Sequence, residues 1–201
     1  MRSVTSSPLQ TRRRAHLLSQ IEGNAYKLFA EHGFSAVTTE DIAVATGISI
    51  STYFRHVPAK EDLLIAPVRQ TIVEIVESYE AGPDGESAAE TLIRQTVASA
   101  RQRTQHSGLT QWRQGILTAP HLLTKAVLIS EDVERRFTEM VAARMGVDAR
   151  SDMRPSLLIA TSLATSKFVL MNWLNTDHWT AISPLHLRLE QALRITLAGF
   201  D

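Results

Sequence analysis

Seven side chains that can donate hydrogen bonds or carry positive charge lie within twelve positions, between residues 49 and 60. They carry hydroxyl groups, a guanidinium, an imidazole and an ammonium: Ser49, Ser51, Thr52, Tyr53, Arg55, His56 and Lys60. Such groups donate hydrogen bonds or carry positive charge, which suits them to phosphate oxygens and to the edges of nucleic-acid bases. The cluster therefore predicts non-covalent recognition of a nucleic acid.

The sequence lacks the usual patterns of a catalytic protein. Its seven histidines show no HExxH or other metal-ligand spacing, and it has no cysteine. It contains no glycine-rich phosphate loop and no G-x-S-x-G elbow. We therefore expect no enzyme, no catalytic residue, no metal site and no cofactor.

The residues around the cluster predict a helix-turn-helix. Thr38 or Thr39 can cap the start of a short helix, and Asp41 stands at capping-box distance from Thr38. Gly47 allows a tight turn, and Ser49 can cap a second helix of about seven residues. Two short helices joined in this way are the arrangement that places a recognition helix in the DNA major groove.

The rest of the chain also has helical rather than strand-like spacing. Apolar residues recur every three to four positions, and glycine or proline stands between the segments. Pro67 falls inside one segment and should kink that helix or delay its start. The expected helices cover residues 11–32, 38–46, 49–56, 60–79, 87–105, 109–119, 122–145, 154–175 and 184–198. The sequence thus predicts an all-α protein of about nine helices.

Three parts are expected along the chain: a disordered basic tail at 1–9, a three-helix DNA-binding domain at 10–58, and a helical effector-binding and dimerisation domain at 59–201. The formal net charge is zero, but residues 1–60 hold seven Lys or Arg and four Asp or Glu, a net +3 that leaves −3 for the remainder. A basic head on an acidic body suits DNA binding.

No apolar run reaches the roughly 18 residues of a membrane span, and the N-terminus has no secretory pattern. A cytoplasmic protein without a membrane partner is expected.

Residues at fixed spacing resemble the TetR family of bacterial transcriptional regulators. The matching positions are Ala25-x-x-Leu28-Phe29-x-x-x-Gly33-Phe34, Thr38-Thr39-x-x-Ile42-Ala43, Gly47-Ile48-Ser49 and Thr52-Tyr53-Phe54-Arg55-His56-Val57-x-x-Lys60-Glu61-Asp62-Leu63. A looser resemblance, to the subgroup related to mycofactocin regulators, lies in Arg113, Ile116-Leu117 and Pro120-His121-Leu122. The resemblance implies a ligand-responsive homodimeric repressor that binds double-stranded DNA at a palindromic operator.

Two positions depart from the family pattern. Phe54 stands where a tyrosine is usual, and Val57 stands where a phenylalanine is usual. Phe54 lacks the hydroxyl that family members often place on a phosphate. An alternative function therefore remains open, a helical ligand-sensing dimer whose DNA-binding head is weak or degenerate. The salt dependence of DNA binding would separate the two, because a DNA-binding protein shows a steep slope.

Few side chains of so short a recognition helix can reach bases. Ile50 can press on thymine methyl groups, Ser51 can bond a base or a phosphate, and Arg55 can read guanine or hold a phosphate. By spacing, Tyr53 is also expected to point outward, whereas Phe54 is expected in the core.

The other predicted contacts involve the DNA backbone. Thr39, at a helix N-terminus, can bind phosphate, and the resemblance implies phosphate contacts for His56 and Lys60. Three consecutive arginines can follow the backbone or enter the minor groove, although a solvated basic face would have the same sequence. These arginines and the remaining predicted contacts are Arg12, Arg13, Arg14, Ser49 and Thr52.

The last two expected helices form the predicted dimer surface. In TetR-like proteins these helices pair with their copies as a four-helix bundle; packing within one monomer is the other interpretation of the same stripes. The predicted interface residues are Leu157, Leu158, Thr161, Ala164, Leu185, Leu189, Leu193, Thr196 and Phe200.

The resemblance also implies a pocket for an unknown, largely apolar effector. Apolar walls with a few polar groups are typical of small-ligand sites, although such residues at helical spacing also form plain cores. An anionic acyl ligand would suit the cationic members of the set. The candidates are Trp112, Arg113, Ile116, Phe137, Met140, Val141, Lys167, Phe168, Met171, Asn172 and Trp173.

Overall fold

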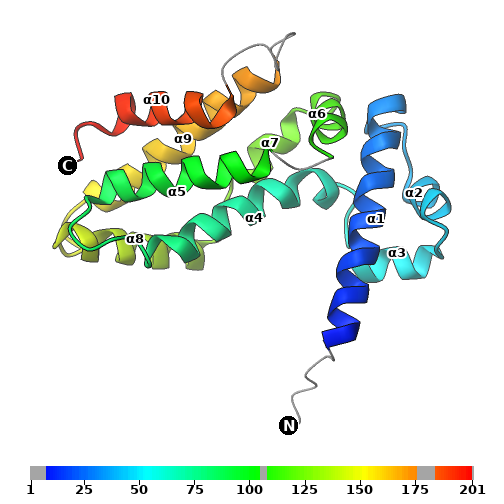
Figure 1. The fold of residues 1–201 in the computed structure, drawn as a ribbon, viewed down its shortest axis with the longest axis horizontal. Helices are drawn as coiled ribbons and strands as arrows, with labels where there is room; N and C mark the ends of the chain where they lie inside the picture. Colours follow the sequence, from blue (N-terminus) through cyan, green and yellow to red (C-terminus); the bar gives the residue numbers. More distant parts are fainter. Residues whose placement is uncertain (1–7, 105–107, 176–183, 201) are drawn as a thin grey trace. The chain divides into compact units, whose positions relative to one another are not determined.

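A computed structural model describes residues 8–104, 108–175 and 184–200. These residues form ten helices and no strand (Figure 1). The helices are α1 (Pro8–His32), α2 (Thr39–Thr46), α3 (Ile50–His56), α4 (Asp62–Tyr79), α5 (Ala88–Arg103), α6 (Leu109–Leu117), α7 (His121–Ala126), α8 (Glu131–Met145), α9 (Arg154–Leu174) and α10 (Leu185–Leu197). The all-α prediction is confirmed.

Besides shifts of one or two residues at several helix ends, the helix boundaries differ from the sequence expectation in two larger ways. The segment 122–145 was expected as one helix, but it is two, because Ser130 caps the start of α8 by accepting a bond from the Val133 amide. This division accounts for ten helices rather than nine. Residues 8 and 9 belong to α1 instead of the expected tail, whose residues 1–7 lie outside the described part of the chain.

The chain divides into two compact units, and the first contains residues 1–66 and 107–122. It holds α1, α2, α3, the start of α4, and α6. Its core is apolar and fully buried, with Ile21, Phe29, Ile42, Leu64 and Ile116 at its centre. The division does not follow the expected domain boundary at residues 58 and 59, because α6 packs with the N-terminal helices.

Three contacts hold α6 in the first unit. The indole Nε1 of Trp112 donates to the carbonyl of Leu64 at 3.0 Å. The amide of Phe34 donates to Thr118 Oγ1, just after α6, at 2.8 Å. A Cβ atom on Gly115 would lie 3.0 Å from the Cβ of Phe29, so the absent side chain lets α6 approach α1 closely. The helix is therefore a structural part of this unit although it lies far away in the sequence.

Pro67 lies inside α4, and the helix continues through it. Proline has no N–H, so the carbonyl of Leu63, one turn earlier, loses its usual helical donor. The hydroxyl of Tyr26, on α1, donates to this carbonyl at 3.0 Å. Because the lost bond is replaced, the proline is tolerated in mid-helix.

The second unit contains residues 67–106 and 123–201. Here α10 packs against α9 and α5, and α8 packs against α9 (Figure 1). The stripe of leucines on α10 at 185, 189, 193 and 197 is buried in these contacts. The expected dimer residues Leu185, Leu189 and Leu193 are thus core residues of the monomer.

An ionic network closes the loop between α4 and α5. The guanidinium of Arg144, on α8, donates to the carbonyls of Gly82, Pro83 and Glu86 at 2.8–3.2 Å. The Glu86 carboxylate accepts bonds from Arg94 at 2.8–3.2 Å, which lowers its pKa to about 2. The network therefore fixes the loop to α5 and α8.

Of the described helices, α9 alone is long and apolar enough to cross a membrane by composition, with a mean hydropathy of 1.4. This is weak support for a membrane span, since the core helix of a soluble protein passes the same test. Two apolar faces of α9 explain its high mean hydropathy. One, including Leu158 and Val169, is buried, and the other, including Leu157 and Phe168, is exposed.

Candidate nucleic-acid interface

The two short helices of the first unit are set by local hydrogen bonds. Thr38 and Asp41 form the expected capping box, with the Asp41 amide donating to Thr38 Oγ1 at 3.1 Å and the Thr38 amide donating to Asp41 Oδ2 at 2.9 Å. These bonds lower the pKa of Asp41. Gly47 ends α2 with φ +71°, and Ser49 caps α3 by accepting from the Thr52 amide at 3.2 Å. The helix-turn-helix therefore begins and ends as the sequence predicts.

The outward side of α3 carries both polar and apolar groups. Ser51 and Arg55 lie four residues apart, both are exposed, and together they form the centre of the side opposite the buried face. Ile50 and Phe54 lie beside them, 36% and 48% exposed. The helix thus presents a guanidinium and a hydroxyl together with two apolar side chains.

Tyr53 and Phe54 have exchanged their expected positions. Tyr53 is fully buried, whereas Phe54 is exposed and meets the Tyr53 ring edge-on, with 5.4 Å between centroids. The reason is helical spacing, because Tyr53 shares its face with the buried Val57. The expectation that Tyr53 points outward and Phe54 inward is wrong.

Tyr53→Phe is expected to raise the free energy of unfolding by about 1–2 kcal/mol, because a buried hydroxyl without a partner costs desolvation energy. The Tyr53 hydroxyl has no hydrogen-bond partner among the described residues, and burial raises its pKa to about 12. Urea denaturation would measure the change. DNA affinity should stay the same; a fall in affinity would show that this hydroxyl reaches DNA.

Lys60 serves the fold of the loop between α1 and α2. Its Nζ donates to the carbonyls of Phe34 and Val37 at 2.8 and 2.6 Å, and it lies 4.3 Å from the centroid of the Phe34 ring. Two of its three donors are therefore used inside the protein. These bonds give Lys60 a structural role, and its phosphate contact stays a prediction.

The predicted phosphate site at the start of α2 has an unfavourable electrostatic setting. Thr39 Oγ1 donates to Glu40 Oε2 at 2.9 Å, and Asp41 occupies the capping position beside it. Two carboxylates in the first turn offset the helix dipole that would attract phosphate. Ser49 Oγ and Thr52 Oγ1 also bond each other at 2.9 Å. These hydroxyls therefore stabilise the helix starts.

The remaining predicted DNA contacts stay predictions. Arg12, Arg13 and Arg14 are exposed on the first turns of α1. His56 is partly buried at the end of α3, and its Nδ1 has no partner among the described residues.

The predicted ligand residues are divided between the two units. Trp112, Arg113 and Ile116 belong to the first unit, and the others belong to the second. Within the second unit, Phe137, Val141 and Trp173 are buried, and Phe137 packs edge-on against Tyr79. Phe168 is 68% exposed and Asn172 is exposed as well, so these two do not line an interior pocket.

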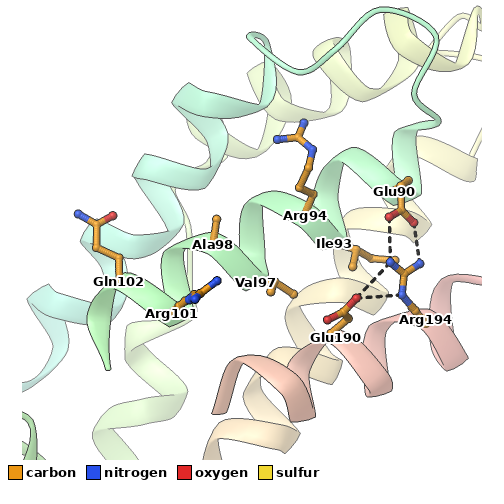
Figure 2. A pocket seen from close by; sticks show the side chains of 9 residues that line it. All are labelled: Glu90, Ile93, Arg94, Val97, Ala98, Arg101, Gln102, Glu190 and Arg194. Carbon is orange, nitrogen blue, oxygen red and sulfur yellow. Dashed lines mark hydrogen bonds and ion pairs between the residues drawn. The ribbon is translucent and has the colours of Figure 1, made fainter. Parts of the chain in front are cut away.

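Two open grooves lie in the second unit. One, of about 470 Å³, runs between α5 and α10 (Figure 2). There Arg194 bonds Glu90 at 2.8 and 2.9 Å and Glu190 at 3.2 Å. The other, of about 560 Å³, is formed by the α4–α5 loop and α8. Of the predicted ligand residues, only Met140 lines either groove.

The predicted dimer residues divide between two environments. On α9, Leu157 and Ala164 are exposed and Thr161 is partly exposed, while Leu158 is fully buried. On α10, the Thr196 hydroxyl accepts a bond from Thr165 Oγ1 at 3.1 Å. Phe200 is partly exposed beyond the end of α10. Phe168, predicted as a ligand residue, is exposed on α9 as Leu157 and Ala164 are.

Comparison with known proteins agrees with this arrangement. Residues 23–66 match the sequence model of bacterial regulatory proteins of the tetR family. The chain is 27% identical over 204 residues to the HTH-type transcriptional regulator TcmR of Streptomyces glaucescens, covering 96% of this chain and 88% of that protein.

Solved structures share the fold. FadR of Thermus thermophilus, a TetR-family repressor crystallised with lauroyl-CoA, superposes with a TM-score of 0.55 at 22% identity, over 90% of this chain and 94% of that one. The SmeT–triclosan complex gives a TM-score of 0.55 at 18% identity, over 92% and 91%. The helix-turn-helix region thus matches the model of a family of bacterial regulatory proteins, and nearly the whole chain is similar to a transcriptional regulator.

Proposed function

We propose that the protein is a ligand-responsive homodimeric repressor that binds a palindromic DNA operator through α3. The observation that carries the proposal is the outward side of α3, where Arg55 and Ser51 stand exposed on a helix fixed by Gly47 and Ser49. Guanidinium and hydroxyl groups at this place suit base edges and phosphates of the major groove. A protein with this role acts where the DNA is, so a cytoplasmic location follows from the proposal.

Arg55→Ala is expected to lower operator affinity about 10- to 100-fold, because Arg55 supplies the cation of the outward face. Fluorescence anisotropy at two salt concentrations, with DNA from the gene's own upstream region and with random DNA, would measure this. Arg136→Ala, which removes an exposed arginine of α8, is the matched control and should leave affinity unchanged. Weak, equal binding of wild type to both DNAs would favour the alternative function, a ligand-sensing dimer with a degenerate head.

The exposed face of α9 supports the dimer. Its apolar and small side chains follow one another at helical spacing on one side of the helix: Leu157, Thr161, Ala164, Phe168 and Met171. An exposed apolar stripe of this length favours burial against another surface. A two-fold axis would pair the stripe with its own copy, and two heads would then reach half-sites about one helical turn apart.

Phe168→Glu is expected to convert the dimer to a monomer and to weaken operator binding, because a carboxylate would be buried within the stripe when two copies pair. Sedimentation velocity would report the mass. Leu128→Glu changes an exposed leucine between α7 and α8, away from the stripe, and should leave the dimer intact. A wild-type monomer at micromolar concentration would contradict the proposed interface.

The second unit is the proposed effector domain. Support comes from the fold shared with FadR and SmeT, which were solved with lauroyl-CoA and triclosan, two molecules that each carry a sizeable apolar part. We also propose kinship with mycofactocin regulators on the basis of Pro120, His121 and Leu122, where α7 begins. Release of operator DNA by acyl-CoA, measured in the same anisotropy assay, would test the effector class.

A further inference from the structure

We propose that α3 reads thymine through an apolar pair, Ile50 and Phe54, so that the operator half-site is recognised partly by thymine C5-methyl groups. This deepens the proposed function and rests on it. It identifies a specificity-determining role for Phe54, a residue that sequence analysis had assigned to the core.

Helical spacing places the two apolar side chains next to each other. Ile50 and Phe54 are separated by four residues, one helical turn, and therefore stand on the same side of α3. They are 36% and 48% exposed, whereas Tyr53 and Val57 on the inner face are 0% and 3% exposed. The helix has only seven residues, so this pair is a large part of what it can present.

Phe54 is held in place by the core. Its ring meets the buried Tyr53 ring edge-on at 5.4 Å and 84°, which is a favourable aromatic geometry. Because Tyr53 is fully buried, one side of the Phe54 ring is fixed while the other remains open to solvent. A ring supported in this way loses little conformational freedom when it docks against DNA.

The chemistry of the pair favours thymine. Neither side chain can donate a hydrogen bond, so neither gains from a phosphate oxygen or from the polar edge of guanine, adenine or cytosine. In the major groove thymine alone of the four bases carries an apolar group, its C5-methyl, and apolar side chains select for it. Ser51 and Arg55, one position further along the helix, supply the polar contacts beside it. A half-site with thymine next to the base or phosphate held by Arg55 matches this arrangement.

The experiment removes the methyl group and nothing else. The full-length protein first selects its operator from a random duplex library, and each thymine of the half-site is then replaced in turn by deoxyuridine. We expect at least one replacement in each half-site to weaken binding of wild type by roughly three- to tenfold, as for the loss of one buried methyl group. The same replacement should have little further effect on Ile50→Ala or Phe54→Ala.

Matched variants keep the result interpretable. Val44→Ala changes an apolar side chain that is 80% exposed on α2, outside the recognition helix, and should keep the full sensitivity to deoxyuridine. Phe54→Tyr retains the aromatic ring and should also keep the full sensitivity to deoxyuridine. Circular dichroism would show that each variant is folded.

The outcomes separate this inference from the proposed function. If the selection enriches an operator but deoxyuridine is tolerated at every position, thymine reading is overturned while DNA binding stands. The same conclusion follows if the deoxyuridine effect is equally large in wild type, Ile50→Ala and Phe54→Ala. If no sequence is enriched, the proposed function fails first.

Discussion

Phe29→Ala is expected to lower the free energy of unfolding by about 3–5 kcal/mol and to abolish operator binding at growth temperature. The ring is fully buried in the first unit, 5.1 Å from the Phe34 ring and in contact with the place where Gly115 brings α6 against α1. Truncation removes the apolar contacts and leaves a cavity, which together cost this much in well-packed cores. Urea denaturation followed by circular dichroism would measure the loss.

A second substitution at the same position tests whether the loss of stability comes from the lost side-chain volume. Phe29→Leu keeps most of the volume and should cost about 1.5 kcal/mol or less. If Phe29→Ala cost no more than Phe29→Leu, the contact between α1 and α6 would not be tight, and α6 would not be an integral part of the first unit. A loss of DNA affinity without a loss of stability would likewise contradict the packing argument.

Lys60→Met is expected to lower the free energy of unfolding by about 2–4 kcal/mol, the second-largest effect. The ammonium bridges the carbonyls of Phe34 and Val37, and hydrogen bonds made by charged groups contribute about 1.5–3 kcal/mol each. Methionine preserves the apolar stem but offers no donor. Thermal and urea unfolding would measure the change.

The salt dependence of DNA binding distinguishes the two roles of Lys60. If it is structural, the folded fraction of Lys60→Met should bind DNA with the same salt slope as wild type. If Lys60 instead neutralises a phosphate, the slope should fall by about one and stability should hardly change. Lys27→Met, which removes an exposed lysine from α1, is the control for the loss of one positive charge.

Much of the first unit could be predicted because its signals are local. The capping box of Thr38 and Asp41, the turn at Gly47 and the cap at Ser49 each involve residues within three positions of each other, and the structure contains them as expected. Residues so near each other in the sequence form these hydrogen bonds in any fold that contains the helix.

Helical spacing predicts which residues share a face of a helix, but it does not predict which face is buried in the core. On α3, the spacing groups Tyr53 with Val57 and Ile50 with Phe54, yet either aromatic residue could have faced the core. In the packed first unit it is Tyr53 that is buried in the core, and Phe54 is exposed. The same ambiguity explains α10, whose leucine stripe suits a dimer surface equally well but packs against α9 and α5.

By itself, then, the sequence determined the helical class, the helix starts and the helix-turn-helix, because capping, turn geometry and apolar spacing act over a few residues. Only the tertiary structure decided which faces are buried, that Lys60 bonds the loop before α2, and that α6 packs with α1. These depend on contacts between residues 23 to 84 positions apart, as for Lys60 with Val37 and Phe34 with Thr118. No local pattern encodes such a partner, since it is chosen by the shape and polarity of the whole unit.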